Sequence, residues 1–218
     1  MASLTPLTAQ QADDHLGGWY AAEASWEPRH GRLGFEADLQ FRDFQVAGDF
    51  AQLSLRSGLV IHSRARPLSL VVGAAWFVSG EPGPGEATQT ERRVYQTLNF
   101  SQPISEKVRL NHRARAEQRW FQGDYFRTRY RYRLGTDVAL GGQGFTGREL
   151  RLVISDEVLV NGETEAGGRG FDRLDQNRAY VALNWPVREG TRLEAGYLNV
   201  LKGDLVLHRL RVTIGLDF

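Results

Sequence analysis

The sequence predicts an all-β fold: a single antiparallel, up-and-down β-barrel that spans a membrane. Three observations predict it. Apolar and polar residues alternate along many segments, and this period of two sends the two residue sets to opposite faces of a strand. The segments run well beyond the roughly five or six residues usual in soluble sheets, and they suit a tilted crossing of a bilayer. No apolar stretch among the 218 residues is long enough for a transmembrane helix.

Composition fits such a barrel. Hydrophobic residues make up 41% and charged residues 24% of the chain, as expected where only alternate residues face lipid. The net charge of +1 indicates no polyanionic partner, and the absence of Cys fits an oxidising compartment. The length suits one domain, so we expect a polar N-terminal segment at 1–17 and a barrel at 18–218.

Eleven segments carry the alternation. In chain order they are 18–27, 33–43, 51–62, 68–79, 91–101, 107–120, 125–139, 149–160, 176–187, 191–201 and 205–218. Clusters of turn-forming residues separate them, for example at 28–31, 63–67, 141–147 and 188–190. Bacterial single-chain barrels usually have an even number of strands, so residues 3–12 are the candidate for one more. We therefore expect about twelve strands, within a range of ten to twelve.

The lengths of the connections also alternate. Counting back from Phe218, one rim carries the connections 44–50, 80–90, 121–124, 161–175 and 202–204. The two longest connections, 80–90 and 161–175, belong to this set. Short turns on one rim and long loops on the other are typical of outer-membrane barrels, so this rim is expected to face outside.

The two faces of the strands have opposite chemistry. In 33–42, Phe35, Ala37, Leu39 and Phe41 alternate with Glu36, Asp38, Gln40 and Arg42. In 125–134, Phe126, Thr128, Tyr130, Tyr132 and Leu134 alternate with Arg127, Arg129, Arg131 and Arg133. A soluble sheet would bury its apolar set, whereas a membrane barrel turns that set to lipid and encloses the charged one.

Aromatic residues favour the membrane barrel. They cluster near the predicted strand ends, as interfacial girdles require: Trp19, Tyr20, Trp26, Trp76, Phe77, Phe100, Trp120, Phe126, Trp185, Tyr197 and Phe218. A soluble β-sandwich that acts as a binding module stays as an alternative.

Short motifs spread over residues 18–218 resemble a known family. They are Gly18-Trp19-Tyr20, Glu36 with Arg42, Glu91 to Gln96, His112 to Arg119, Arg129 to Tyr132, Asp156-Glu157, Asp175 to Arg178, Gly196 to Asn199 and His208. On these residues the chain resembles the outer-membrane family called domain of unknown function 2490. The resemblance implies an outer-membrane barrel and assigns no activity.

The final strand resembles the terminal strand of bacterial outer-membrane barrels. Leu210, Val212, Ile214, Leu216 and Phe218 alternate with polar residues, and the chain stops on the aromatic ring. This resemblance implies that barrel-assembly machinery reads the Phe218 strand. It also implies outer-membrane lipid and lipopolysaccharide as surroundings, and the bacterial outer membrane as location.

Arginine-rich strands supply the candidate site. Arg interleaved with aromatic residues could bind nucleic acid, but the alternation gathers these arginines in a lumen with acidic partners, and we expect no nucleic-acid binding. The candidate lumen-binding residues are Arg93, Arg113, Arg115, Glu117, Arg119, Arg129, Arg131, Glu157 and Arg178. Two interpretations remain open: a salt-bridge ladder that plugs the lumen, or a narrow path or pocket for small anionic solutes.

Catalysis is the alternative class of function. Polar residues on the predicted lipid face include His112, Asp156 and His208, and a lipid-modifying acyl hydrolase or transferase would keep its catalytic groups there. No Gly-x-Ser-x-Gly elbow occurs, and no Ser is convincingly placed beside either His. The glycine pattern at 142–147 leads into a strand rather than a helix, and the five His lack zinc spacing. We therefore expect a non-enzymatic protein with no catalytic residue, metal or cofactor.

Overall fold

The computed structural model describes residues 16–28, 31–64, 66–81, 88–123, 125–143 and 149–218. Strands dominate this part of the chain, and none of it forms a helix long and apolar enough to cross a membrane. The strands are β1 Leu16–Trp26, β2 Leu33–Asp43, β3 Phe50–His62, β4 Leu68–Ser79, β5 Gln89–Pro103, β6 Val108–Phe121, β7 Tyr125–Gln143, β8 Glu149–Asn161, β9 Glu165–Ala166, β10 Arg169–Gly170, β11 Leu174–Arg188, β12 Thr191–Lys202 and β13 Leu205–Asp217.

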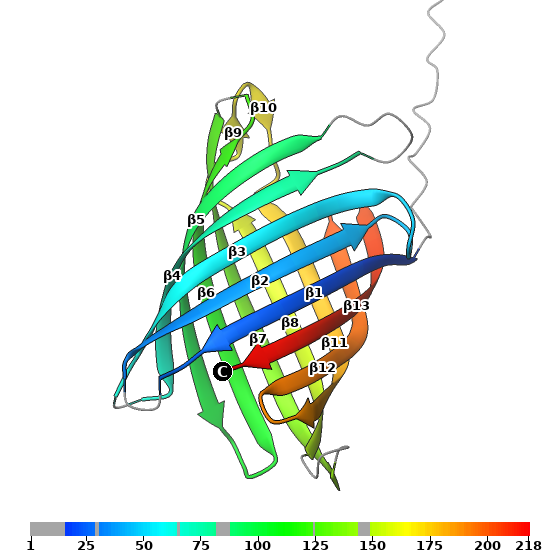
Figure 1. Cartoon of the computed structure of the whole chain (residues 1–218). Helices are drawn as coiled ribbons and strands as arrows, with labels where there is room; N and C mark the ends of the chain where they lie inside the picture. The colour runs from blue at the N-terminus through cyan, green and yellow to red at the C-terminus, as the bar shows by residue number, and fades with distance from the viewer. Residues whose placement is uncertain (1–15, 29–30, 65, 82–87, 124, 144–148) are drawn as a thin grey trace, which may run out of the picture.

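The long strands form one closed barrel. Their order around it is β1, β13, β12, β11, β8, β7, β6, β5, β4, β3 and β2, so each strand lies beside its neighbour in sequence (Figure 1). All eleven predicted strands are confirmed, with ends shifted by a few residues. The short β9 and β10 form a separate hairpin inside the predicted loop 161–175. A single closed sheet does not fit the alternative of a β-sandwich, which needs two packed sheets.

Barrel closure corrects the prediction of a purely antiparallel sheet. Residues 16–25 of β1 pair with residues 208–217 of β13 in parallel, while all other neighbouring barrel strands are antiparallel. The reason is geometric: strands that alternate in direction can close with an odd number only through one parallel pair. Eleven strands in the described residues fall within the expected ten to twelve, and the candidate strand at 3–12 lies outside those residues.

Successive strands run in opposite directions, so their connections alternate between the two rims. The rim away from Phe218 carries the connection from β4 to β5 and the longer one from β8 to β11, which holds the β9–β10 hairpin (Figure 1). The other rim has shorter connections, such as the two residues between β11 and β12. The predicted segregation of the two longest loops to one rim is confirmed.

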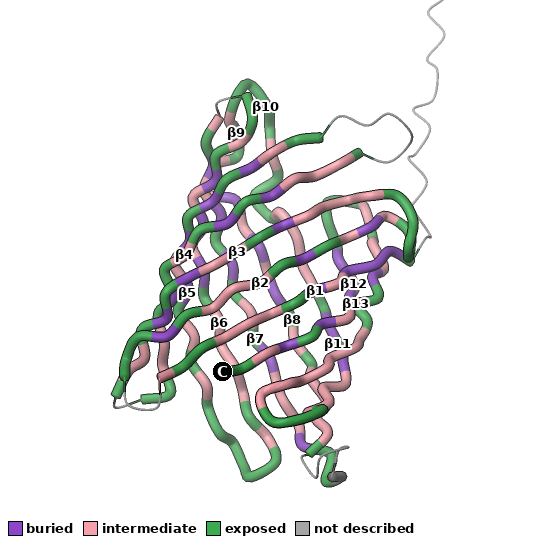
Figure 2. Tube along the Cα trace, viewed as in Figure 1, coloured by how far each residue is buried: buried purple, intermediate pink, exposed green. Residues whose placement is uncertain are grey.

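The barrel has inverted polarity. Leu59 is 60% exposed and Tyr130 is 55% exposed on the outer face, whereas Glu117 and Arg129 keep only 2% and 4% of their surface exposed inside. Buried and exposed positions alternate along the strands, as the tube in Figure 2 shows. Two small apolar clusters also lie inside, one around Val71, Phe77 and Tyr95 and the other around Trp19 and Leu198. Charged side chains fill much of the remaining interior.

Candidate anion-binding lumen

A cavity of about 1440 Å³ occupies the barrel interior. Its lining reaches from Ser63 and Arg66 at the rim near Phe218 to Gln89 and Tyr125 near the opposite rim. Since a water molecule takes about 30 Å³ of liquid volume, the space could hold water on the order of tens of molecules. The side chains therefore do not fill this lumen completely.

Cationic side chains outnumber acidic ones around this cavity. The acidic lining residues are Glu23, Glu27, Glu91, Asp137, Glu157, Asp175, Glu194 and Asp217. The cationic lining residues are Arg42, Arg56, Arg66, Arg93, Arg109, Arg113, Arg119, Arg127, Arg129, Arg131, Arg133, Arg151, Arg169, Arg178, Arg192, Lys202 and Arg211. The surplus of positive charge arises because the strands turn their Arg-rich faces inward.

Glu117 on β6 is the centre of a buried ion-pair network, called here the Glu117 network. Its Oε2 accepts hydrogen bonds from Arg129 Nη2 at 2.6 Å and Nε at 2.9 Å. Its Oε1 accepts one from Arg131 Nη1 at 2.9 Å, and Arg93 Nη1 lies 3.5 Å from Oε2. Arg129 and Arg131 come from β7 and Arg93 from β5, so one carboxylate joins three adjacent strands. Buried charges are costly unless they are paired in this way.

Two further glutamates extend the network. Glu91 Oε1 accepts hydrogen bonds from Arg93 Nε and Arg119 Nε, both at 2.6 Å. Glu157 on β8 accepts from Arg131 Nη2 at 2.8 Å and from Arg113 Nη2 at 2.9 Å.

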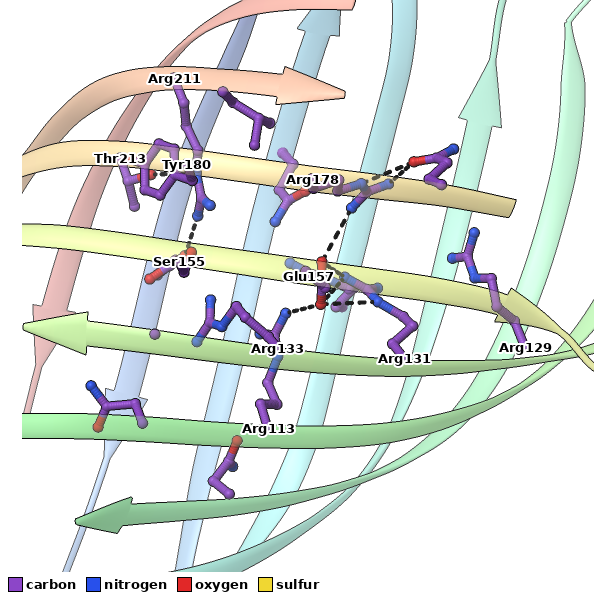
Figure 3. A pocket seen from close by; sticks show the side chains of 18 of the residues that line it. Arg113, Arg129, Arg131, Arg133, Ser155, Glu157, Arg178, Tyr180, Arg211 and Thr213 are labelled. Atoms are coloured by element: carbon purple, nitrogen blue, oxygen red, sulfur yellow. Dashed lines mark hydrogen bonds and ion pairs between the residues drawn. The ribbon is translucent and has the colours of Figure 1, made fainter. Parts of the chain in front are cut away.

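Figure 3 shows Glu157 between arginines of neighbouring strands; Arg178 Nη1 lies 3.6 Å from its Oε2. Asp175 joins at the rim, 2.8 Å from Arg129 Nη1. Together these pairs form a continuous wall along β5 to β8 and β11.

Some arginines stack on rings in place of binding carboxylates. Arg42 lies 3.4 Å from the Trp19 ring centre, and Arg115 lies 4.3 Å from that of Tyr95 while its Nε donates to Thr97 Oγ1 at 2.7 Å. Arg127 lies 3.5 Å from the centre of the Phe171 ring, and its buried Nε and Nη2 have no hydrogen-bond partner. Cation–π contact gives such charges part of the stabilisation that a carboxylate would supply.

The connection between β8 and β11 contacts β7 next to Arg127, at the mouth of the lumen on the rim away from Phe218. Glu163 accepts hydrogen bonds from the Thr128 backbone N–H at 2.6 Å and from Thr128 Oγ1 at 2.9 Å. Its slight burial would raise the pKa of Glu163, but the bonds from Thr128 outweigh that effect and lower the pKa below its usual value. Phe171, from the same connection, lines the cavity beside Arg127.

Eight of the nine candidate residues belong to one connected set of ion pairs, and Arg115 is the exception. Seven of them line the cavity: Arg93, Arg113, Arg119, Arg129, Arg131, Glu157 and Arg178. Glu117 is buried behind this surface in the network, and Arg115 stands apart from it on Thr97 and Tyr95. Sequence reasoning missed the acidic partners Glu91 and Asp175. Glu91 shares a strand face with Arg93, and this spacing was the signal that could have identified it.

The polar residues of the outer face are arranged differently. His112 Nδ1 lies 2.8 Å from the Tyr132 hydroxyl, and His208 Nδ1 contacts the Tyr197 hydroxyl. His112 and Asp156 flank Leu134 of β7 from either side, so the intervening strand separates them. Within the described residues, neither His bonds to a Ser, and no group of three His, Asp or Glu side chains is arranged to hold a metal.

Comparison with known proteins identifies a family. The family model described as "Protein of unknown function (DUF2490)" matches residues 16–204, which covers the barrel from β1 to the turn before β13. No curated protein sequence matches the chain.

Proposed function

This chain belongs to the DUF2490 family, and from that premise we propose that it is an integral barrel of the bacterial outer membrane whose cationic lumen binds or passes small anionic solutes. The proposed role is non-enzymatic. The observation that carries it is the surplus of arginine around an interior cavity of about 1440 Å³, enclosed by a barrel with an apolar exterior.

The outer face supports the membrane location. Large apolar side chains follow its strands, among them Leu55, Leu59, Leu98, Tyr130 and Ile154, each more than two-fifths exposed. Soluble proteins rarely expose contiguous apolar patches of this extent, whereas a membrane barrel needs such a band against lipid. Lipid and lipopolysaccharide are then its surroundings, and the Phe218 strand is the segment that assembly machinery would read.

The lumen supports the preference for anions. Charged rings and clusters select ions in narrow pores because a low-dielectric wall strengthens their field. The Glu117 network pairs the arginines of one wall with carboxylates. In this proposal the structural ladder and the anion path are therefore two parts of the same interior rather than alternatives. Where arginines lack carboxylates, a mobile anion would compensate their charge.

Membrane location is tested by extraction. We expect the protein to leave membranes only with detergent and to migrate differently on gels before and after heating. Leu55→Arg places a cation on the lipid face and is expected to destabilise the folded form in lipid by about 2–4 kcal/mol. The matched control, Gln52→Arg, puts the same cation on the inward face of the same strand, where residue 52 lines the polar cavity, and it should cost much less. Full solubility without detergent would contradict the proposal.

Anion transfer is tested in planar bilayers. With the full chain reconstituted under a salt gradient, we expect conductance steps whose reversal potential shows a preference for anions. Charge-removing variants of lumen arginines should shift that potential towards the cation side, and Arg92→Gln on the outer face should leave it unchanged. Conductance that prefers cations, or none at all, would refute the transport form of the proposal.

A further inference from the structure

We propose that Arg133, Arg113 and Arg211 form a selective site for a multiply charged oxyanion of the phosphate type in the lumen. This inference rests on the proposed function and deepens it by naming the class of ligand. The three arginines come from β7, β6 and β13, so the site would join two distant parts of the barrel wall.

Arg133 is the starting observation. It lines the cavity near the middle of β7, and among the described residues it has neither a hydrogen-bond nor an ion-pair partner. Its cross-strand neighbour on one side is Glu157, but that carboxylate already binds Arg131 and Arg113. Glu157 is therefore near Arg133 but is occupied by the other two arginines, so the Arg133 guanidinium group remains available to bind a ligand.

The neighbour on the other side of Arg133 is also cationic. Arg113 is its direct cross-strand partner, on the same inward face. Like charges placed directly opposite each other in a sheet are destabilising. Arg113 uses one nitrogen, Nη2, for Glu157, while its buried Nε has no partner. An anion between these two guanidinium groups would relieve the repulsion and satisfy the orphaned donor.

Arg211 supplies the third positive charge from across the barrel. Its positive charge is close enough to repel that of Arg133. Figure 3 shows both side chains directed into the same part of the cavity. Its bonds to Glu23 and Thr213 are long, both 3.3 Å, so part of its hydrogen-bonding capacity remains weakly used.

Open space lies beside Arg133. Gly135 is the next inward residue on β7, and Ser155 is its partner on β8. A Cβ atom added at Gly135 would lie 3.4 Å from Ser155 Cβ, so a longer side chain would have to enter the lumen. Glycine at this position keeps the space free, and the Ser155 hydroxyl on its border can donate to an oxyanion.

The charges around the site indicate the ligand class. Guanidinium forks match the paired oxygens of phosphate and carboxylate groups. Glu157 and Glu23 attract the positive charge of Arg133, so a bound anion must compete with these two fixed carboxylates. A divalent phosphate group meets this requirement better than chloride because its interaction with the same arginines is about twice as strong at equal distance.

The test uses inorganic phosphate and the full chain in detergent. Isothermal titration with phosphate is expected to show saturable binding, and Arg133→Gln should weaken it about tenfold or more, because a hydrogen-bonded charge is lost. Arg133→Lys keeps the charge without the fork and should fall between the two. Arg151→Gln, the same charge change nearer the rim, should weaken binding at most about twofold through the long-range field.

The possible results distinguish failure of the phosphate site from failure of the proposed function. Equal losses for Arg133→Gln and Arg151→Gln, or no saturable phosphate binding by the wild type, would overturn the site. Arg133→Gln removes a repulsive neighbour, so the folded barrel should persist and its weaker binding should not reflect unfolding. Anion-selective conductance without phosphate block would refute this site and leave the proposed function standing. Phosphate binding without conductance would refute the transport form alone.

Discussion

Arg131 and Arg133 lie two residues apart on the same strand and the same inward face, yet their surroundings are opposite. Arg131 is 8% exposed and donates to both Glu117 and Glu157 at 2.8–2.9 Å. Arg133 faces the same cavity with Arg113 directly opposite and without a hydrogen-bond or ion-pair partner among the described residues. The difference shows that position on an inward face does not by itself give an arginine a carboxylate partner, because neighbouring arginines compete for the few carboxylates within reach.

Two parts of the lumen differ in the same way as these two arginines. Along β5 to β8, the Glu117 network joins the strands through charge-assisted hydrogen bonds. Around Arg133 the cations exceed the acids that face them. The first part is expected to be needed for folding, and the second to be available for a ligand. Separate variants can test each expectation.

The largest effect is expected from Glu117→Gln. Removal of this charge deprives Arg93, Arg129 and Arg131 of their shared carboxylate, and breaking a buried ion pair by neutralising one partner costs about 3–5 kcal/mol. The free energy of unfolding is measured by denaturant titration of the folded and unfolded gel bands. Glu165→Gln on the exposed β9 is the matched control, and it should change stability by less than about 0.5 kcal/mol. Equal stability of the two variants would contradict the structural role of the network.

The next largest effects on the free energy of unfolding are expected at Arg131 and Arg133, and they should have opposite signs. Arg131→Gln leaves Glu117 and Glu157 with fewer partners and should lower the free energy of unfolding by about 3 kcal/mol. Arg133→Gln relieves a like-charge pair and should raise it by about 0.2–1 kcal/mol when no anion is added. Thermal unfolding of both variants in the same detergent gives the sign. A loss of stability in Arg133→Gln would mean that Arg133 is also a structural residue.

A smaller effect is expected at the mouth of the lumen. Phe171→Leu removes the ring that stacks on Arg127, a contact worth about 0.5–2 kcal/mol, and should loosen the connection from β8 to β11. Trypsin cleavage at the exposed Arg169 should then become several-fold faster. Phe171→Tyr keeps the ring and is expected to be cleaved like the wild type. Identical rates for all three proteins would show that the stacking does not hold this connection.

The alternation of residues predicted the strands because each face has one environment. It placed all eleven barrel strands and the inward direction of Arg129, Arg131 and Glu157. Two-residue strands are too short to alternate, so the β9–β10 hairpin was missed. The parallel closure follows from the parity of the strand count rather than from any residue in β1 or β13.

Pairing inside the lumen could not be predicted in the same way. The alternation predicts that Arg131 and Arg133 both point inward and does not distinguish them. Only the three-dimensional positions of Glu117 and Glu157 show that Arg131 is the one that is paired. Asp175 lies just before the predicted strand at 176–187, so the alternation did not predict whether its side chain points inward or outward. Which carboxylate an arginine reaches depends on register and on competition from its neighbours, and neither is encoded in one strand.

The smallest expected effect is a pH dependence at the mouth. The pKa of Glu163 is lowered by the hydrogen bonds from Thr128, so its contribution to stability is fully present above the unfolded-state pKa and is lost as pH falls through the folded-state pKa. Protection of the Thr128 amide from hydrogen exchange, corrected for intrinsic rates, should therefore decline on acidification. Glu163→Gln keeps an acceptor without a titrating charge, and its protection should be independent of pH over the same range. A wild-type profile as flat as that of the glutamine variant would show that the Glu163 charge does not hold the connection against β7 beside Arg127.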